Sequence, residues 1–321
     1  MELRHLRAFR AVARTLSFTR AATELHYAQS SVTEQIQALE TELGSRLFDR
    51  RGRKLELTPA GARLIEYADR VLLLVEEARS AVVDDPDEPS GELTIGALET
   101  LCAHRLPSVL ARYRAACPRV KVIVREGNRG ELYGAVRRGE LDAGLTFGSP
   151  PADEALAGRT LAHDRLMVVA PTTHRLSSLD EVRMLDLHRE PFLATEPGCG
   201  FREMYDRAVG GLGPDGPVVI AEVTSFAALC SCVAAGMGCA LLPEIAVSGP
   251  VARGEVAAIP LAGAESRTTV TMTWLRRRER KSALAAFLET AGEVFTGLGV
   301  AGSSVPVPPK IPPRTHAHGN G

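Results

Sequence analysis

The sequence has no long apolar run and few aromatic side chains, and these absences narrow its class. No run of about 18 consecutive apolar residues occurs among the 321 residues, so we expect no membrane span. The N-terminus lacks the apolar core of a signal peptide, which predicts a cytoplasmic protein. Phosphate-binding loops, dinucleotide fingerprints and metalloprotease motifs are also missing, so we expect no enzyme and no cofactor.

Cysteine chemistry of the common structural kinds is missing as well. The six cysteines form no Cys-x-x-Cys pair and none has a histidine at zinc-finger spacing, so we expect no metal site. Buried free thiols are one interpretation of these residues. A redox sensor is the other, with Cys199 as its candidate because a glycine-rich loop surrounds it.

The stretch from Ser17 to Gly61 has the pattern of a winged helix-turn-helix, preceded by a supporting helix over residues 3–16. Ser17 is a good N-cap, and apolar residues then repeat at helical spacing up to Leu25. After a turn at residues 26–28, a second helix runs from about Gln29 and ends at Gly44. This order predicts a domain that places one helix in a DNA groove.

The second helix has an apolar face and a polar face. The apolar face carries Val32, Ile36, Leu39 and Leu43, and the polar face carries Ser30, Thr33, Glu34, Gln37 and Thr41. Amides and hydroxyls of this kind bond base edges or phosphates, although any single amphipathic helix can simply expose such a face to solvent. Five basic residues within positions 46–54 then predict a hairpin that neutralises phosphates. This hairpin favours a DNA-contacting helix over a plain surface helix.

The run LSFTRAATELHYAQSSVTEQIQALETELGSRLFDR, followed by LTPAG, resembles the LysR-type transcriptional regulators, and the resemblance covers residues 1 to about 296. It implies that positions matching Gln29, Ser30, Thr33 and Glu34 face the major groove and that Arg53 lies on the wing. Two residues depart from the family pattern: Ala28 replaces the usual Ser or Thr, and Glu34 replaces a frequent Arg or Lys. The candidate DNA-contacting residues are Ser17, Arg20, Gln29, Ser30, Ser31, Thr33, Glu34, Gln37, Arg50, Arg51, Arg53 and Lys54.

The sequence also predicts a long helix, a hinge and a C-terminal tail. Residues 1–58 form the DNA-binding domain. Residues 59–83 form a long helix whose apolar positions step by four and three, which predicts a dimerisation helix with a seam between chains at Leu64, Ala68, Val71, Val75, Ala78 and Val82. Residues 84–91 are acidic, contain two prolines and form a hinge. Residues 297–321 are rich in proline and glycine and form a disordered tail.

Between residues 92 and 296, strands alternate with helices, which predicts an α/β domain with a parallel sheet. We expect subdomain I at 92–160 and 268–296 and subdomain II at 161–267. Two lobes joined by two crossings resemble the periplasmic-binding-protein-like effector domain of the same family.

Loops at the carboxyl ends of these strands are the expected effector site. Hydroxyls of Thr100, Thr224 and Ser225 fall at helix starts, where a small anion is favoured, although each can also be an ordinary N-cap. The family resemblance implies that the position of Thr100 lines the effector cleft. The candidate effector-binding residues are Thr100, Thr146, Gly198, Cys199, Gly200, Phe201, Thr224 and Ser225.

A ligand-responsive, DNA-binding transcription regulator accounts for every segment. Its expected partners are double-stranded DNA with an inverted repeat, a small-molecule effector, RNA polymerase, and further copies of the chain in a dimer or tetramer. Anions are among the classes of effector that we expect. A cysteine-based redox regulator is the alternative within this class. A solute-binding protein is the alternative from another class, and it explains only residues 91–296.

Overall fold

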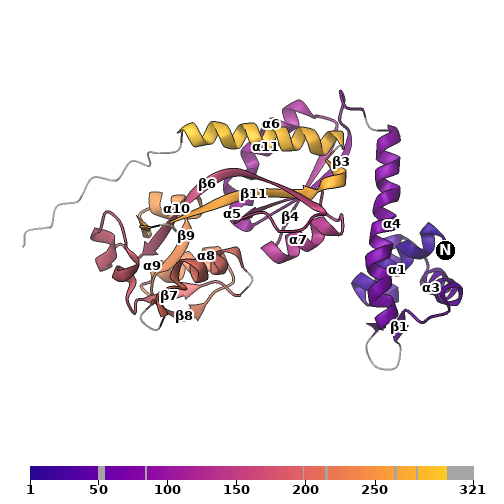
Figure 1. Ribbon diagram of the computed structural model, residues 1–321, viewed down its shortest axis with the longest axis horizontal. Coiled ribbons are helices and arrows are strands. Elements are labelled where there is room, and N and C mark those ends of the chain that lie inside the picture. Colours follow the sequence, from indigo (N-terminus) through magenta and orange to yellow (C-terminus); the bar gives the residue numbers. More distant parts are fainter. Residues whose placement is uncertain are drawn as a thin grey trace, which may run out of the picture.

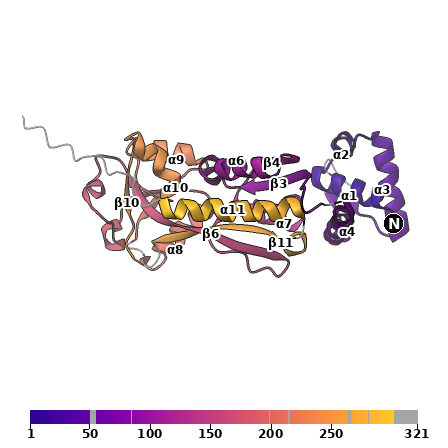
Figure 2. The ribbon, with the colours of Figure 1, turned by 90° about the horizontal axis from the view of Figure 1, so that it is seen from above.

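The structure is a computed structural model that describes residues 1–49, 55–83, 85–197, 199–213, 216–263, 266–279 and 281–301. Figures 1 and 2 show an elongated molecule with a small helical domain at one end and a larger α/β domain at the other. The long helix α4 (Pro59–Val83) belongs to the helical end. Of the helices in the described part of the chain, none is both long and apolar enough to cross a bilayer.

The N-terminal domain is a winged helix-turn-helix. It contains α1 (Leu3–Thr15), α2 (Phe18–Leu25), α3 (Gln29–Leu43) and an antiparallel pair of short strands, β1 (Phe48–Asp49) and β2 (Glu56–Leu57). Its core joins Phe9 of α1, Ile36 of α3 and Phe48 of β1, all of them buried. Ser17 accepts a bond from the backbone N–H of Arg20 and Gly44 ends α3 at φ +63°, so both predicted caps are confirmed.

Helix α4 covers the range expected for the long helix, but its buried face differs from the expected seam. Ala68 and Leu72 are buried against the N-terminal domain, and Leu73 is buried against the α/β domain. The expected placement of Ala68 in a seam between chains is therefore wrong, because its own chain covers it. The apolar side chains that stay exposed on α4 are Tyr67, Val71, Leu74 and Val82.

The first lobe begins with β3 (Gly91–Ala97), which pairs in parallel with β4 (Val120–Glu126) and β5 (Ala143–Phe147). Between β3 and β4 the chain forms two helices, α5 (Glu99–His104) and α6 (Leu106–Ala116), rather than one continuous helix. Pro107 is the physical reason, because it has no N–H to bond into the preceding turn and fits best at a helix start. Helix α7 (Arg129–Arg137) begins with a capping box formed by Asn128 and Glu131.

The large sheet is mixed, so the prediction of a parallel sheet is wrong beyond β5. Its strand order is β10-β6-β11-β5-β3-β4, with β9 also paired to β6. Two long strands, β6 (Leu156–Ala170) and β11 (Arg267–Leu275), pair antiparallel and run through both lobes. The expected boundary at residues 160–161 thus falls inside β6. The strand β10 (Ala257–Pro260) was not expected, and with β9 (Ala240–Pro243) it completes the sheet.

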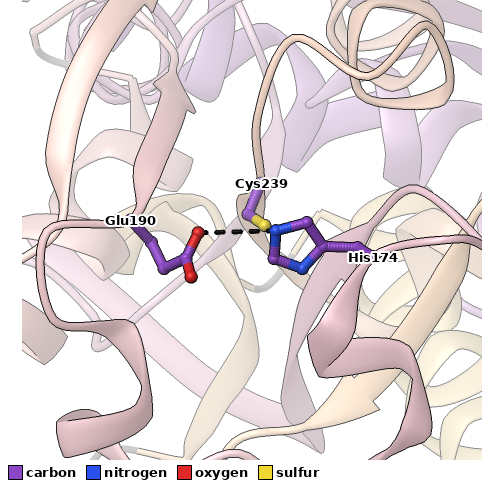
Figure 3. A group of neighbouring side chains, drawn as sticks. All are labelled: His174, Glu190 and Cys239. Carbon is purple, nitrogen blue, oxygen red and sulfur yellow. Dashed lines mark ion pairs between the residues drawn. The ribbon is translucent and has the colours of Figure 1, made fainter.

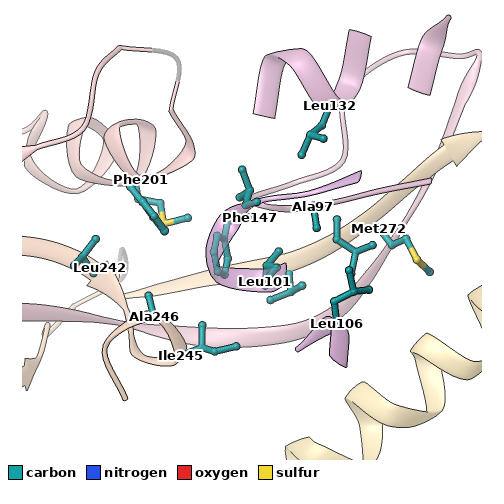
Figure 4. Close-up of a cluster of buried hydrophobic side chains, with 14 of the residues drawn as sticks. Ala97, Leu101, Leu106, Leu132, Phe147, Phe201, Leu242, Ile245, Ala246 and Met272 are labelled. Carbon is teal, nitrogen blue, oxygen red and sulfur yellow. The ribbon is translucent and has the colours of Figure 1, made fainter. Parts of the chain in front are cut away.

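The second lobe adds a smaller parallel pair, β7 (Pro191–Ala194) and β8 (Val218–Glu222). Its helices are α8 (Gly200–Val209), α9 (Phe226–Ala234) and α10 (Glu244–Ala252), with 3₁₀ turns η1 (Arg175–Ser178) and η2 (Met184–Leu187). One continuous apolar core crosses both lobes, and Figure 4 shows Phe147 and Leu101 of the first lobe beside Phe201 and Ile245 of the second.

The chain returns to the first lobe through η4 (Arg276–Arg278) and α11 (Ser282–Ala301). Helices α11 and α6 pack together, and the hydroxyl of Tyr113 donates to the carbonyl of Ala283 at 2.8 Å. Helix α11 continues past the expected start of the tail at residue 297, because packing of Phe287, Ala291 and Phe295 favours its propagation. Residues 302–321, which hold the rest of the expected tail, lie outside the described residues.

Candidate functional site

Helix α3 presents the polar face that the sequence predicts for DNA contact. Val32, Ile36 and Leu39 are fully buried under α1 and α2, so the opposite side of the helix points outward. Leu43 is an exception among the predicted inward residues, because it is 42% exposed at the helix end. The side chains exposed on the outer face are Gln29, Ser30, Glu34, Gln37 and Thr41, with Thr33 and Ser31 partly exposed.

Local hydrogen bonds already occupy part of this face. The hydroxyl of Thr33 donates to the carbonyl of Gln29 at 3.0 Å, and that of Thr41 donates to the carbonyl of Gln37 at 2.8 Å. Both hydroxyls keep lone pairs with which they can accept from a base or a bridging water. Ser17 is engaged as the N-cap of α2, while Arg20 stays exposed one turn later.

A carboxylate that sequence patterns did not single out fixes the wing against α3. Glu40 accepts hydrogen bonds from the backbone N–H groups of Leu47 at 2.7 Å and Phe48 at 3.3 Å. These two residues begin the hairpin, so α3 and the wing are held in one orientation. The predicted wing contacts Arg50, Arg51, Arg53 and Lys54 lie outside the described residues.

The candidate effector residues lie where the two lobes meet. Phe147 at the end of β5 contacts Phe201 in α8, with ring centroids 5.7 Å apart. Beside them, Arg129 at the start of α7 forms an ion pair with Glu203 on α8. Leu98, just before α5, lies against Gly200, where an added Cβ would be 4.0 Å from the leucine methyl. The predicted residues Gly200 and Phe201 therefore belong to the surface between the lobes.

Among the residues that the structure describes, two hydroxyls in this region are buried and find no hydrogen-bond partner. They are Oγ1 of Thr100, which is 2% exposed on α5, and Oγ1 of Thr195, which is 3% exposed after β7. A buried hydroxyl without a partner costs about 1–3 kcal/mol, so these two groups gain most from a polar ligand. Thr146 differs, because its hydroxyl bonds the hydroxyl of Tyr133 at 3.0 Å.

The structure places all three of the predicted hydroxyls at helix starts. Thr100 lies in the first turn of α5, whose N-cap is Leu98, so the alternative that it is an ordinary N-cap does not apply. Ser225 is an N-cap, because it precedes α9 and accepts from the N–H of Ala228 at 3.5 Å, and Thr224 is exposed beside it. Gly198 lies outside the described residues.

The arginines next to these loops are already paired with carboxylates. Arg202 lies 2.7 Å from Glu222 and 3.0 Å from Asp206, and it also donates to the carbonyl of Thr195 at 3.2 Å. Arg129 is likewise paired with Glu203. A ligand in this region would therefore meet polar groups, and the positive charge of both arginines is already compensated.

Three of the six cysteines differ from Cys199 in their surroundings. Burial raises the pKa of Cys102 to about 11, of Cys230 to about 11 and of Cys239 to about 12, so these thiols stay protonated at neutral pH. Cys199 is only partly buried and occupies the N-cap position of α8.

Comparison with known families gives two adjoining matches. The model for the bacterial regulatory helix-turn-helix protein of the lysR family matches residues 3–62. The LysR substrate binding domain matches residues 86–296.

Relatives and solved structures agree with both matches. The uncharacterized HTH-type transcriptional regulator YwqM of Bacillus subtilis is 33% identical over 298 residues, which is 92% of this chain and 100% of that protein. The regulator GltR of the same organism is 30% identical over 290 residues, covering 90% and 95%. Full-length BenM superposes with a TM-score of 0.59 at 28% identity, covering 93% and 98% of the two chains. A full-length OxyR variant from Pseudomonas aeruginosa has the same fold, with a TM-score of 0.73 at 24% identity, covering 91% and 94%.

Proposed function

Because the chain belongs to the LysR family of transcriptional regulators, we propose that α3 reads an inverted-repeat operator and that a small molecule bound between the two lobes controls this binding. The observation that carries the proposal is the outer face of α3, where hydrogen-bonding side chains stand exposed above a fully buried apolar seam. Gln29 begins this helix, where an amide is well placed to bond adenine.

Selection of bound DNA from a random pool, at two salt concentrations, tests the first half of the proposal. An inverted repeat should be enriched, because two copies of α3 in a dimer would meet two half-sites one helical turn apart. Retention that depends on salt alone, with no enriched sequence, would contradict it.

Two variants distinguish base recognition from contact with the phosphate backbone. We expect Gln29→Ala to lose about 1–3 kcal/mol of discrimination at one base position while leaving the salt dependence nearly unchanged. We expect Arg53→Ala, at the position that the family resemblance assigns to the wing, to weaken binding to all sequences and to reduce the salt slope by about one unit. Titrating each variant with the selected operator and a scrambled duplex measures both effects, and identical behaviour would refute the assigned roles.

The exposed apolar side chains of α4 support pairing between chains. These side chains follow one another at intervals of four, three and eight residues, so they lie near one side of α4. They are Tyr67, Val71, Leu74 and Val82. We propose that two α4 helices pack through this stripe in a dimer, and that dimers associate further into tetramers. Sedimentation of wild type and of Leu74→Glu checks this, because a charge in a packed stripe should shift the chain toward the monomer.

For the effector, the unpartnered hydroxyls of Thr100 and Thr195 support a small polar ligand that bonds both lobes. Paired arginines nearby favour hydrogen bonding over bare charge recognition, although small anions stay among the ligands to screen. Such a ligand changes operator binding only if it binds the DNA-bound and free conformations unequally. Contact with RNA polymerase is the proposed output of that change.

Thermal-shift screening against matched sets of uncharged polar compounds and carboxylates tests this half. A hit should lose at least about tenfold in affinity in Thr100→Val and in Thr195→Val, because each loses a hydrogen bond worth about 1.4 kcal/mol. The control is Thr173→Val, an exposed threonine of the second lobe outside the candidate loops, which should leave the affinity unchanged.

A redox-sensing regulator is the second candidate, and the observation that favours it is Cys199, a partly buried thiol at the start of α8. Helix N-termini stabilise thiolates. Operator binding that responds to peroxide in wild type and fails to respond in Cys199→Ser would support this candidate, and an equal response in both would remove it.

A further inference from the structure

Three side chains of the kinds that bind metals converge in the second lobe. His174 precedes η1, Glu190 precedes β7 and Cys239 precedes β9, so distant parts of the sequence supply them. The nitrogen, oxygen and sulfur atoms they offer all lie within 4.8 Å of one another. Figure 3 shows one imidazole nitrogen of His174 facing both the carboxylate of Glu190 and the sulfur of Cys239.

Backbone hydrogen bonds hold two of these residues in place. The N–H of Cys239 donates to the carbonyl of Pro191 at 2.8 Å, and its carbonyl accepts from Leu193 at 2.7 Å. The carbonyl of Glu190 accepts from Val218 at 2.8 Å. Cys239 is fully buried and Glu190 is 9% exposed. Because the fold already holds these two residues in place, a ligand that binds them causes little further loss of conformational entropy.

The cluster is separate from the proposed effector site. It lies at the amino end of β7, whereas Thr195 follows the carboxyl end of the same strand. The proposed function makes no use of His174, Glu190 or Cys239.

We propose that His174, Glu190 and Cys239 form a binding site for a borderline-soft divalent cation of the Zn²⁺ or Co²⁺ class. Thiolate, imidazole and carboxylate suit these ions, whereas Mg²⁺ and Ca²⁺ select oxygen ligands. Tetrahedral bonds of about 2.0–2.3 Å place neighbouring ligand atoms about 3.3–3.8 Å apart. The distance between Nε2 of His174 and Oε2 of Glu190 is 3.4 Å. Three protein ligands leave one position for water.

Coordination changes the protons of two ligands. Nδ1 of His174 accepts a hydrogen bond from the N–H of Leu176 at 3.3 Å, so the neutral ring carries its proton on Nε2. Binding through Nε2 requires the other tautomer and gives up this long hydrogen bond, at a cost of about 1 kcal/mol. As the sulfur–metal bond forms, the thiol proton of Cys239 passes to solvent and the cation stabilises the resulting thiolate.

Arg175 competes with the cation for the same carboxylate. Its guanidinium pairs with Glu190 and donates to the carbonyl of Asp186 at 2.6 Å, yet its side chain is 57% exposed. A cation in the cluster repels this guanidinium and takes over its partner. Removing Arg175 should therefore strengthen cation binding, which a purely structural cluster would not show.

The test is a titration of the full chain, reduced and freed of metal with a chelator, with Co²⁺ as the probe. We expect a sulfur-to-cobalt charge-transfer band together with intense ligand-field bands of a four-coordinate ion, saturating at one Co²⁺ per chain. Zn²⁺ should abolish both signals by displacement. Absence of the charge-transfer band in the folded protein would overturn the proposal.

Matched variants locate the site. We expect Cys239→Ala to lose the charge-transfer band, and Cys117→Ala, a buried cysteine of the first lobe, to keep it. We expect His174→Gln to weaken Co²⁺ binding by more than about 100-fold and Arg175→Ala to tighten it by about tenfold. Circular dichroism checks that each variant folds, and the exposed position of Arg175 keeps that variant informative if Cys239→Ala unfolds. A band that survives in Cys239→Ala, or weaker binding in Arg175→Ala, would refute the site.

Discussion

At the scale of single residues, Glu40 links α3 to the start of the wing. It is the acceptor for two backbone N–H groups, those of Leu47 and Phe48. Helical spacing places Glu34 opposite the apolar face and Glu40 at its edge, but it does not show which groups Glu40 bonds. Only the fold shows that Glu40 turns back toward the hairpin.

Replacing Glu40 by Ala should loosen the start of the wing. The two N–H groups lose their acceptor in a partly buried setting, which costs about 1–3 kcal/mol. Amide hydrogen exchange at Leu47 and Phe48 measures this directly, with at least about tenfold faster exchange expected. Glu34→Ala is the control, since its side chain lies on the exposed face, and equal protection in the two variants would contradict the role given to Glu40.

At the scale of elements, α4 carries a carboxyl group, that of Asp69, whose burial disfavours the charged form. Asp69 is 8% exposed, and burial raises the pKa of its carboxyl, while Arg10 partly offsets this and Glu140 adds to it. The protonated form is thus favoured by the fold. Its contribution to stability is fully present below the ordinary value of 3.8 and is lost as the pH rises through the raised folded-state pKa.

Asp69→Asn should therefore raise the free energy of unfolding at pH 7. The gain should shrink as the pH falls and vanish below about 3.8, where the wild-type carboxyl is neutral in both states. Urea unfolding across this pH range is the measurement. Asp87→Asn, in the exposed hinge, should leave the curve unchanged, and a destabilised Asp69→Asn would show that the carboxylate is needed where it is.

The elements also show where sequence reasoning succeeds. Caps such as Ser17 and Gly44 depend on neighbours within one turn, so the helices of the N-terminal domain were predictable. The partners of β11 depend on packing far along the chain, and the alternation of strands and helices predicted the wrong sheet direction there. The split at Pro107 has a local cause, the missing N–H of proline. The cluster of His174, Glu190 and Cys239 gives no sequence signal, because only the tertiary fold, including an isolated bridge between Phe192 and Cys239, brings it together.

At the scale of the whole molecule, ion pairs join the N-terminal domain to the first lobe. Glu140, after α7, lies 3.7 Å from Arg14 of α1 and 3.2 Å from Arg138. Burial alone would raise the pKa of Glu140, but the hydrogen bond and charge of Arg138, with Arg14 and Arg10, lower it. This contribution is present above the ordinary value of 4.5 and is lost as the pH falls through the lowered folded-state pKa.

Glu140→Gln should weaken this junction by about 0.5–1 kcal/mol at pH 7, because the charge pair with the half-exposed Arg14 is lost. Hydrogen exchange along α1 and α7 should speed up at pH 7 and match the wild type once the carboxyl is protonated. The control is Glu255→Gln, whose partner Arg253 lies in the same surface turn and whose loss should leave α1 and α7 unchanged. An unchanged junction at pH 7 would remove Glu140 from this role.

The passage of β6 and β11 through both lobes has a mechanical meaning. Neighbouring strands in a sheet are rotated relative to one another by an angle that varies among sheets, so a strand pair can change its twist while its hydrogen bonds persist. The two lobes are therefore joined by a connector in which a change of twist rotates one lobe against the other. A ligand that draws the lobes together would change this twist, and the rotation would reach the first lobe, where the ion pair of Glu140 with Arg14 connects it to the N-terminal domain.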